Sequence, residues 1–429
     1  MSKVPAAVFV ALMILAATAS SPSPRAETPV PDGWTLEGVV LYGRHSLRSP
    51  AEPVPCRGAD DRACFDNLAA RPWPSFGVAA GNLLPEAYPR VRALGTYLRG
   101  RYARQGLLPP DGCPATKAAA VMHADDERTT MTAGALADGL VPGCALDLHP
   151  DAATYSAGPA CAVDPKVVPA AALAFVGGSW AARTGGDLAR PLAVLNEVLG
   201  PFRAGGCARY GLAPGCSLAT ADPAKAPAMA SAPAEQILFE YAAGYPEAEV
   251  GWGRLASAAG MPLGAAVTTV NKVHALAFAA VNMPPAIGTR PGSKSLHLVL
   301  GSLAELATRP QAARARVVAY VSHDRLILHL AGMLGLDWEL ESYNPHQIPP
   351  GGVVAFELWR TADGTAMVRT VYIAQTIEQL REARPLGADN PPATSVMAIP
   401  GCTMAGGACP WMEFERIARA TIDPACTGR

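Results

Sequence analysis

The sequence lacks an excess of charge of either sign. Its 429 residues include 35 lysines and arginines and 36 aspartates and glutamates, so the formal net charge is -1. This balance argues against a general nucleic-acid-binding surface, and a hydrophobic share of 50% argues against a disordered chain. An anionic ligand must therefore be recognised by local groups of basic residues. The length allows one large domain or two or three smaller ones.

Long apolar runs are also scarce. One run, at residues 4–16, follows Lys3 and precedes the small residues Ala17-Thr18-Ala19, which is the pattern of a secretory signal and its cleavage site. The run is roughly 13 residues long, whereas a bilayer span needs ~20, which argues against the alternative of a membrane anchor. We therefore expect residues 1–19 to be a cleaved signal peptide. The mature protein is then periplasmic or secreted and has no membrane attachment.

The ten cysteines contain no Cys-x-x-Cys pair, which argues against a zinc site. An even number of cysteines behind a secretory signal favours structural disulfides. Spacing suggests four pairs and elimination a fifth, although sequence alone does not prove the connectivity. The expected pairs are Cys56 with Cys64, Cys113 with Cys144, Cys207 with Cys216, Cys402 with Cys409, and Cys161 with Cys426.

Strand and helix patterns alternate at both ends of the chain, but the middle reads as helical only. Between residues 151 and 276 strand signals vanish, and we find no internal repeat. The pattern favours an α/β domain formed by residues 34–150 and 277–429, with residues 151–276 inserted as a mostly helical domain. The predicted strands are 36–41, 118–124, 296–300, 317–321, 353–359 and 367–373. The predicted helices are 86–105, 125–140, 188–199, 234–241, 265–281, 326–334 and 411–420.

Basic residues gather where the first predicted strand ends. His45 lies between Arg44 and Arg48 directly after this strand, and ligands of open α/β sheets bind at the carboxyl ends of strands. Arg128 and the pair His323-Asp324 follow two further predicted strands in the same way. Each of these residues alone is more often a surface ion pair or a helix cap. The functional interpretation therefore depends on the three strand ends meeting at one anion.

These residue types suit the hydrolysis of a phosphate ester without a metal or cofactor. Guanidinium forks match phosphate oxygens, and nearby positive charge keeps a histidine neutral and nucleophilic in acid. The neutral histidine attacks phosphorus, and a protonated carboxyl group protonates the departing alkoxide and later activates water. A carboxyl group that must carry a proton predicts an acidic pH optimum. The candidate residues are His45 as nucleophile, Asp324 as acid and base, and Arg44, Arg48, Arg128 and His323 as phosphate ligands.

The same motifs resemble the histidine acid phosphatase family, in the bacterial periplasmic branch of glucose-1-phosphatase and phytase. The resemblance implies a central mixed, mostly parallel sheet flanked by helices, of the phosphoglycerate-mutase-like type, with an inserted helical domain over the cleft. It implies the same site roles and no metal. We expect a monomer or dimer. The resemblance rests on Arg44-His45-Ser46-Leu47-Arg48-Ser49-Pro50, Asp126-Glu127-Arg128-Thr129, Gly251-Trp252-Gly253-Arg254, Ser322-His323-Asp324 and Pro349-Pro350-Gly351-Gly352.

Departures from the family pattern bear on the substrate. The resemblance suggests Glu235 as a substrate-side contact or gate, the alternative being a solvated helical glutamate. Ser46 replaces the common glycine, which predicts a narrower pocket, and Glu52 would repel a highly phosphorylated ligand. Arg325 either binds an extra anionic group or faces solvent. We expect small phosphate monoesters such as sugar phosphates as substrates. A phytase, a phosphoanhydride hydrolase and a non-catalytic phosphate-ester-binding protein are the alternatives.

Overall fold

The computed structural model describes residues 29–428 except for 50–67, 70, 72, 75, 117, 152–154, 156–157, 310–314 and 403. The predicted signal peptide therefore lies outside the described residues. So do Glu52 and the predicted pair of Cys56 with Cys64.

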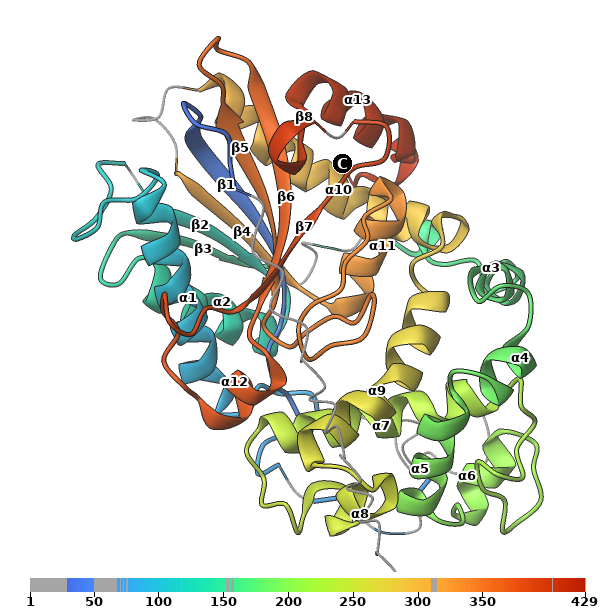
Figure 1. The fold of residues 1–429 in the computed structure, drawn as a ribbon. Helices are drawn as coiled ribbons and strands as arrows, with labels where there is room; N and C mark the ends of the chain where they lie inside the picture. The colour runs from blue at the N-terminus through green and yellow to red at the C-terminus, as the bar shows by residue number, and fades with distance from the viewer. Residues whose placement is uncertain are drawn as a thin grey trace, which may run out of the picture.

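A mixed sheet forms the centre of the described chain (Figure 1). Its strand order is β3-β2-β4-β1-β5-β6-β7, and β8 also pairs with β6. The strands of the β3-β2-β4-β1 half are mutually parallel, and the pairs from β1-β5 onward are antiparallel. Because β6 is antiparallel to β5, it runs in the same direction as β1, so most strands share one direction. The bounds are β1 Thr35–Arg44, β2 Ala120–Ala124, β3 Leu146–Pro150, β4 Val317–Ser322, β5 Val353–Arg360, β6 Ala366–Ala374, β7 Ala393–Met397 and β8 Ala408–Pro410.

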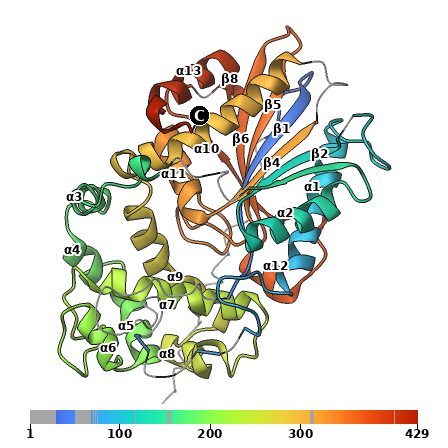
Figure 2. The same cartoon turned by 180° about the vertical axis from the view of Figure 1, so that it is seen from behind.

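Helices cover both faces of this sheet, which confirms the predicted α/β class (Figures 1 and 2). On one face, α1 and α2 pack over a core that includes Val39 and Leu41. These two helices lie unusually close, because a Cβ added to Gly139 of α2 would meet the Arg92 carbonyl of α1 at 2.1 Å. The other face carries α10, α11 and α13, while α12 lies near α7 (Ala226–Ala242). The bounds are α1 Ala87–Arg104, α2 Glu127–Leu140, α10 Pro285–Thr308, α11 Asp324–Leu334, α12 Ile377–Glu382 and α13 Trp411–Thr421.

One predicted strand, 296–300, is wrong because these residues lie inside α10. The short run Leu-His-Leu-Val-Leu alternates like a strand when it is considered alone. The buried residues of α10 nevertheless recur at intervals of three and four, which is the period of a helix packed on a sheet. They include Leu296, Val299, Leu300, Leu303 and Leu306.

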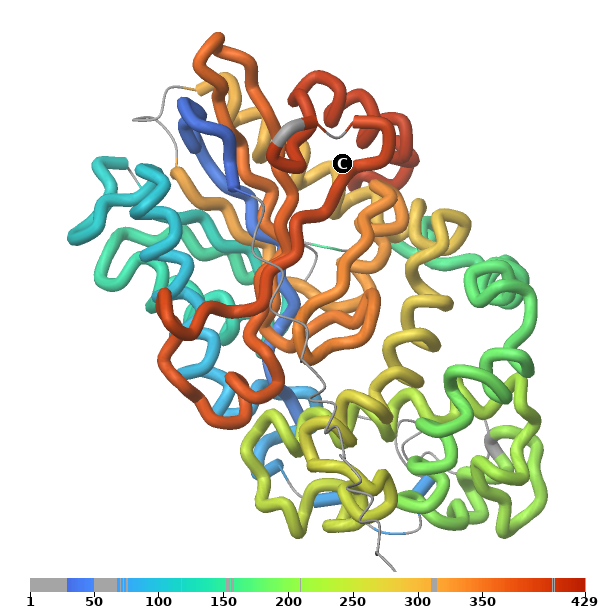
Figure 3. Tube along the Cα trace, viewed as in Figure 1, coloured from blue at the N-terminus to red at the C-terminus, as the bar shows by residue number. Residues whose placement is uncertain are grey.

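Helices also make up the middle of the chain, and they gather at one end of the sheet (Figure 3). No strand occurs among the described residues from 158 to 280. The helical run predicted at 234–241 lies within α7, and those predicted at 188–199 and 265–281 overlap α5 and α9 but extend one residue beyond them. Their division from the sheet as a separate domain stays a prediction, and one apolar cluster contains both Val40 of β1 and Leu195 of α5. The bounds are α3 Val168–Phe175, α4 Trp180–Gly185, α5 Ala189–Leu199, α6 Ala204–Arg209, α7 Ala226–Ala242, α8 Leu255–Ala259 and α9 Leu263–Ala280.

Within the part of the chain that the structure describes, no helix alone has the length and apolarity to cross a membrane. The helices α9 and α10 meet that test only when they are taken together, and they are bent by 81° at the break between them.

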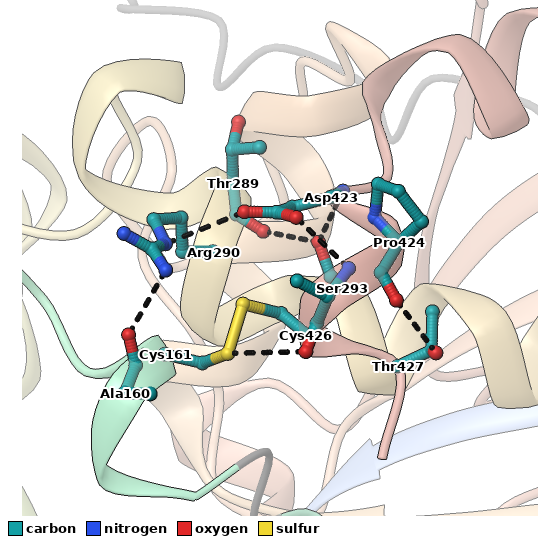
Figure 4. The surroundings of a disulfide bond; sticks show 10 residues. Ala160, Cys161, Thr289, Arg290, Ser293, Asp423, Pro424, Cys426 and Thr427 are labelled. Atoms are coloured by element: carbon teal, nitrogen blue, oxygen red, sulfur yellow. Dashed lines mark hydrogen bonds and ion pairs between the residues drawn. A yellow bond between two sulfur atoms is a disulfide. The ribbon is translucent and has the colours of Figure 1, made fainter. Parts of the chain in front are cut away.

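Four of the five predicted disulfides are confirmed: Cys113 with Cys144, Cys161 with Cys426, Cys207 with Cys216, and Cys402 with Cys409. The bond between Cys161 and Cys426 joins the middle of the chain to its last residues (Figure 4). Arg290 of α10 reinforces this junction, because it donates to the Ala160 carbonyl at 3.0 Å and pairs with Asp423 at 3.4 Å. The carboxyl end is thereby fixed to α10 and to the segment that precedes α3.

Candidate active site

The three motifs that follow predicted strands meet at one edge of the sheet. In the parallel pairing of β1 with β4, Arg44 lies opposite Ser322, and β2 is the other neighbour of β4. Directly after β1, the His45 backbone N–H donates to the Ser322 carbonyl at 2.9 Å. The loops after β1, β2 and β4 therefore surround one volume, as the positions of the motifs in the sequence predict.

A pocket of about 170 Å³ occupies this volume. It is lined by His45, Arg48, Arg128, His323, Asp324 and Arg325. Ser46 is not among these residues. Its hydroxyl oxygen is buried, and it would lie 3.2 Å from a Cβ added to Gly351. The expected narrowing of the pocket by the Ser46 hydroxyl group is therefore not observed.

A hydrogen bond of the His45 ring fixes which of its two nitrogens carries the proton. Nδ1 lies 2.9 Å from the Ser46 carbonyl oxygen, and because a carbonyl only accepts, Nδ1 must carry the proton. Nε2 then holds the free lone pair. Burial lowers the pKa of His45 well below its usual value, and the charges of Arg44 and Arg48 lower it further. The imidazole is therefore neutral and nucleophilic under acidic conditions.

The two terminal guanidinium nitrogens of Arg44, at the end of β1, are engaged by other groups, whereas its buried Nε has no hydrogen-bond partner among the described residues. Arg44 donates to the Ile348 carbonyl and to Oε1 of Glu235, both at 2.6 Å, and it pairs with Oδ2 of Asp324 at 2.8 Å. Only 2% of Arg44 is exposed, and it does not line the pocket. Glu235 is 5% exposed, so the alternative of a solvated helical glutamate is wrong. This carboxylate instead joins α7 to β1.

Arg48 faces the same helix. Its guanidinium lies 3.7 Å from Oε2 of Glu235 and donates to the Ser49 carbonyl at 3.0 Å. The guanidinium carbons of Arg48 and Arg44 lie 5.4 and 5.6 Å from the centre of the Phe239 ring, within the range of a cation–π contact. Unlike Arg44, Arg48 lines the pocket and can meet an anion directly.

Asp324 is the first residue of α11 and lies between the helix and Arg44. Its Oδ1 accepts the Arg325 backbone N–H at 2.8 Å, while Oδ2 pairs with Arg44. Burial raises the pKa of this carboxyl group, but the charges of Arg44, His45 and Arg48 outweigh burial and hold the pKa well below its usual value. The carboxylate is therefore ionised in the ligand-free site.

His323 and Arg128 form the opposite wall of the pocket. Arg128 lies 3.2 Å from Nδ1 of His323, and a guanidinium only donates, so Nδ1 is the acceptor. Nε2 then donates to Oδ2 of Asp125 at 2.9 Å. Arg128 also pairs with Asp126 at 2.8 Å, and Asp126 caps α2 by accepting the Thr129 backbone N–H. Arg128 and His323 thus each have a carboxylate partner.

This wall also contains a group that can hold a cation. Asp125, Asp126 and His323 each offer a donor atom, and these atoms lie within 4.8 Å of one another. The Arg128 guanidinium already contacts Asp126 and His323, so a cation of the chain itself neutralises the group.

Arg325 follows Asp324 at the start of α11 and lines the pocket with an exposed side chain. In the described part of the chain, no carboxylate forms an ion pair with it. Arg44, Arg48, Arg128 and His323 all have acidic partners within 4 Å. Arg325 is therefore a lining cation whose charge is not offset by a neighbouring carboxylate.

Sequence reasoning missed two groups that act on these residues. Asp125 fixes the His323 ring, although it was interpreted only as part of a helix start. His274 of α9 is buried with Nε2 3.5 Å from Oε1 of Glu235. A single histidine within an apolar helix gives no sequence signal for such a contact. The spacing of Ser231 and Glu235 on α7, four residues apart, was the available clue that both face one neighbour.

Comparisons with known proteins identify the family of the chain. The model of the histidine phosphatase superfamily, branch 2, matches residues 35–174 and 271–373, which together are more than half of the chain. The chain is 29% identical to the phytase AppA of Escherichia coli, over 91% of this chain and 93% of that protein. It is 24% identical to a glucose-1-phosphatase of Salmonella typhimurium, over 95% and 98% of the two chains.

Solved structures of similar fold include phytases. The apo form of the Hafnia alvei phytase matches with a TM-score of 0.77 and 28% identity, covering 93% of this chain and 99% of that one. The complex of the Hafnia alvei phytase with myo-inositol hexakis sulphate matches with a TM-score of 0.74 and 27% identity, covering 92% and 99%.

Proposed function

The chain belongs to branch 2 of the histidine phosphatase superfamily and is a histidine-type acid phosphatase, and from this premise we propose that it hydrolyses small phosphate monoesters such as sugar phosphates. The observation that carries the proposal is the His45 ring. Its Nδ1 proton is held by the Ser46 carbonyl, which leaves the Nε2 lone pair free in a pocket lined by arginines. No metal or cofactor takes part in the proposed reaction.

In the first step, Nε2 of His45 forms a bond to phosphorus while the bond from phosphorus to the ester oxygen breaks. Arg48 and Arg128 bind the phosphoryl oxygens and stabilise the charge that develops on them. His323 is a third proposed ligand, and it donates to a phosphoryl oxygen when that oxygen replaces Asp125 as the acceptor of its Nε2 proton. Arg44 is a fourth proposed ligand. It reaches a phosphoryl oxygen when that oxygen replaces one of its present carboxylate contacts. Glu235 acts from the substrate side as the counter-ion of Arg44. Arg44 leaves this carboxylate when it binds the phosphoryl oxygen and pairs with it again when the phosphate departs.

Asp324 gives its proton to the departing ester oxygen and takes one back from water in the second step. Because Arg44 keeps this carboxylate ionised, the proton must arrive with the substrate. A monoanionic ester brings it directly, and a dianionic phosphate offsets the arginine charge and raises the pKa of Asp324. Acid favours both routes, so we expect an acidic pH optimum. A rate profile that peaks above neutrality would contradict this step.

Arg325 favours a second candidate for the substrate class. A pocket of about 170 Å³ suits one phosphoryl group and the adjoining part of its leaving group. Arg325, which has no carboxylate partner among the described residues, would favour a substrate with a second anionic group, as a phytase substrate or a phosphoanhydride has. The relatives include both a phytase and a glucose-1-phosphatase, and so they support both candidates.

A substrate panel in the presence of EDTA separates these candidates. We expect turnover of glucose 1-phosphate at acidic pH with EDTA present. Loss of all turnover on addition of EDTA would contradict the metal-free mechanism. Replacing Arg325 by glutamine tests the second anion site, and Arg419→Gln on α13 is the matched control for an exposed arginine. If Arg325→Gln slows inositol hexakisphosphate or pyrophosphate hydrolysis and spares glucose 1-phosphate, the phytase or phosphoanhydride candidate is favoured.

We also propose that the protein works outside the cytoplasm, in the periplasm or as a secreted enzyme. The four disulfides support an oxidising compartment. Amino-terminal sequencing of the mature protein tests the expected removal of residues 1–19. The separate domain character of residues 151–276 is tested by limited proteolysis, which should cut at its borders first.

A further inference from the structure

Behind the pocket, a buried histidine contacts the carboxylate that holds Arg44. His274 of α9 is 7% exposed, and its ring stacks on Phe278 at a centroid distance of 5.2 Å. Nδ1 lies 3.0 Å from the hydroxyl oxygen of Ser231, and Nε2 lies 3.5 Å from Oε1 of Glu235. The same Oε1 accepts a hydrogen bond from Arg44 at 2.6 Å. A chain of polar contacts thus runs from α9 through α7 to β1.

The partners of the ring allow both a neutral and a charged imidazole. In the neutral form, Nε2 must carry the proton, because a lone pair facing the Glu235 carboxylate would be repelled. Ser231 then donates its hydroxyl proton to Nδ1. In the charged form, Nδ1 donates to the Ser231 oxygen instead, since a hydroxyl group can rotate to accept. The site therefore satisfies His274 in either protonation state without moving the helices.

We propose that His274 is a positioning residue that takes up a proton when an anion occupies the pocket, and that its charge weakens the hold of Glu235 on Arg44. The inference rests on the proposed function, because the anion concerned is the phosphoryl group that Arg44 binds. An imidazolium shares the Glu235 carboxylate with Arg44, so Arg44 becomes freer to bind an anion. Linkage requires the reverse effect as well, so the bound anion strengthens proton binding at His274.

The charged groups that act on His274 come from three packed elements. They are Glu235 on α7, Arg44 on β1 and Asp324 on α11. Burial lowers the pKa of His274, and Arg44 lowers it too, whereas Glu235 and Asp324 raise it. The net shift is downward, so proton uptake falls on the acidic side of the usual histidine range. An acid phosphatase would meet its substrate under those conditions.

The test measures anion affinity against pH in the full-length protein. Sulfate is the probe, because its charge does not change across the range, and its inhibition constant is measured from pH 3.5 to 7.5. His274→Gln keeps a side-chain donor near Glu235 but does not titrate. At acidic pH we expect the KM and the sulfate inhibition constant of this variant to rise about fivefold, while kcat stays within about twofold of wild type. His329→Gln is the control, because His329 is a buried histidine of α11 whose ring nitrogens have no hydrogen-bond partner among the described residues.

Two results overturn the proposal. The first is a sulfate profile of His274→Gln that superimposes on the wild-type profile. The second result comes from a titration of wild-type protein, which replaces the first test if this variant does not fold. Wild-type protein with labelled histidines then shows eight ring signals, and Ser231→Ala identifies that of His274. The proposal fails if sulfate does not move the titration of this signal to higher pH. Sulfate binding needs no turnover, so a failed inference remains distinct from a failed phosphatase assignment.

Discussion

Glu240 should make the protein lose stability as the pH rises from acid to neutrality. This residue of α7 is fully buried, and Oε2 accepts the Gly251 backbone N–H at 2.9 Å. That bond supports a turn in which Gly251, Trp252 and Gly253 all have positive φ angles, a conformation that costs free energy at the tryptophan. Burial, aided by the charge of Glu249, raises the pKa of Glu240 to about 8.

The magnitude follows from the two pKa values. In the unfolded chain Glu240 ionises near pH 4.5, whereas the folded protein keeps this group protonated up to about pH 8. Between these values folding takes up a proton, so the free energy of unfolding falls as the pH rises. At 1.36 kcal/mol per pH unit, the loss between pH 4.5 and pH 7 is about 3 kcal/mol. Below pH 4.5 both states are protonated and the contribution is constant.

Glu240→Gln removes this titration and keeps an acceptor for the Gly251 N–H. We expect the variant to match wild type near pH 4.5 and to exceed it by about 3 kcal/mol at pH 7, measured by urea unfolding at several pH values. Glu247→Gln is the matched control, because Glu247 is an exposed glutamate that follows the same helix. Parallel stability curves of wild type and Glu240→Gln from pH 4.5 to 8 would refute the reasoning.

Three further predictions concern catalysis and stability. Asp324→Asn should lower kcat by about 10²- to 10⁴-fold for sugar phosphates and by less for p-nitrophenyl phosphate, whose leaving group needs no proton; equal losses on both substrates would contradict the acid role. Burial lowers the pKa of His329 to about 4, so the free energy of unfolding should fall by about 3 kcal/mol as the pH drops from 6.5 to 4. In His329→Leu this fall should be smaller by the same amount, measured by urea unfolding over the same pH range. Replacing Cys161 and Cys426 by serine should lower stability by roughly 5 kcal/mol, because their bond spans 265 residues, and an unchanged thermal midpoint would contradict this.

The sheet and the core of the site follow from local patterns in the sequence. Apolar runs such as 317–321 mark buried parallel strands, and a polar motif directly after such a run lies at the ligand-binding edge. This rule alone brought His45, Arg128 and Asp324 together. This result did not depend on knowing the order of the strands in the sheet, because parallel strands end on the same side.

Long-range pairing is what the sequence did not reveal. The predicted helix 86–105 gives no sign that one of its arginines is buried, yet Arg101 is 5% exposed and pairs with the buried Glu357 of β5 at 2.8 Å. The contact of Glu235 with Arg44 spans 191 residues, and that of Asp125 with His323 spans 198. Periodicity reports which face of an element is apolar, and it says nothing about which buried charge on a distant element will neutralise another.

The formation of phosphohistidine at His45 tests the central claim most directly. Wild-type protein and Asp324→Asn are mixed with phosphorus-labelled substrate, quenched in alkali, and digested to locate the label. We predict label on the peptide that contains His45 in both proteins and none in His45→Ala. A labelled peptide elsewhere in the chain, or turnover by wild type and His45→Ala at the same rate, would contradict the account.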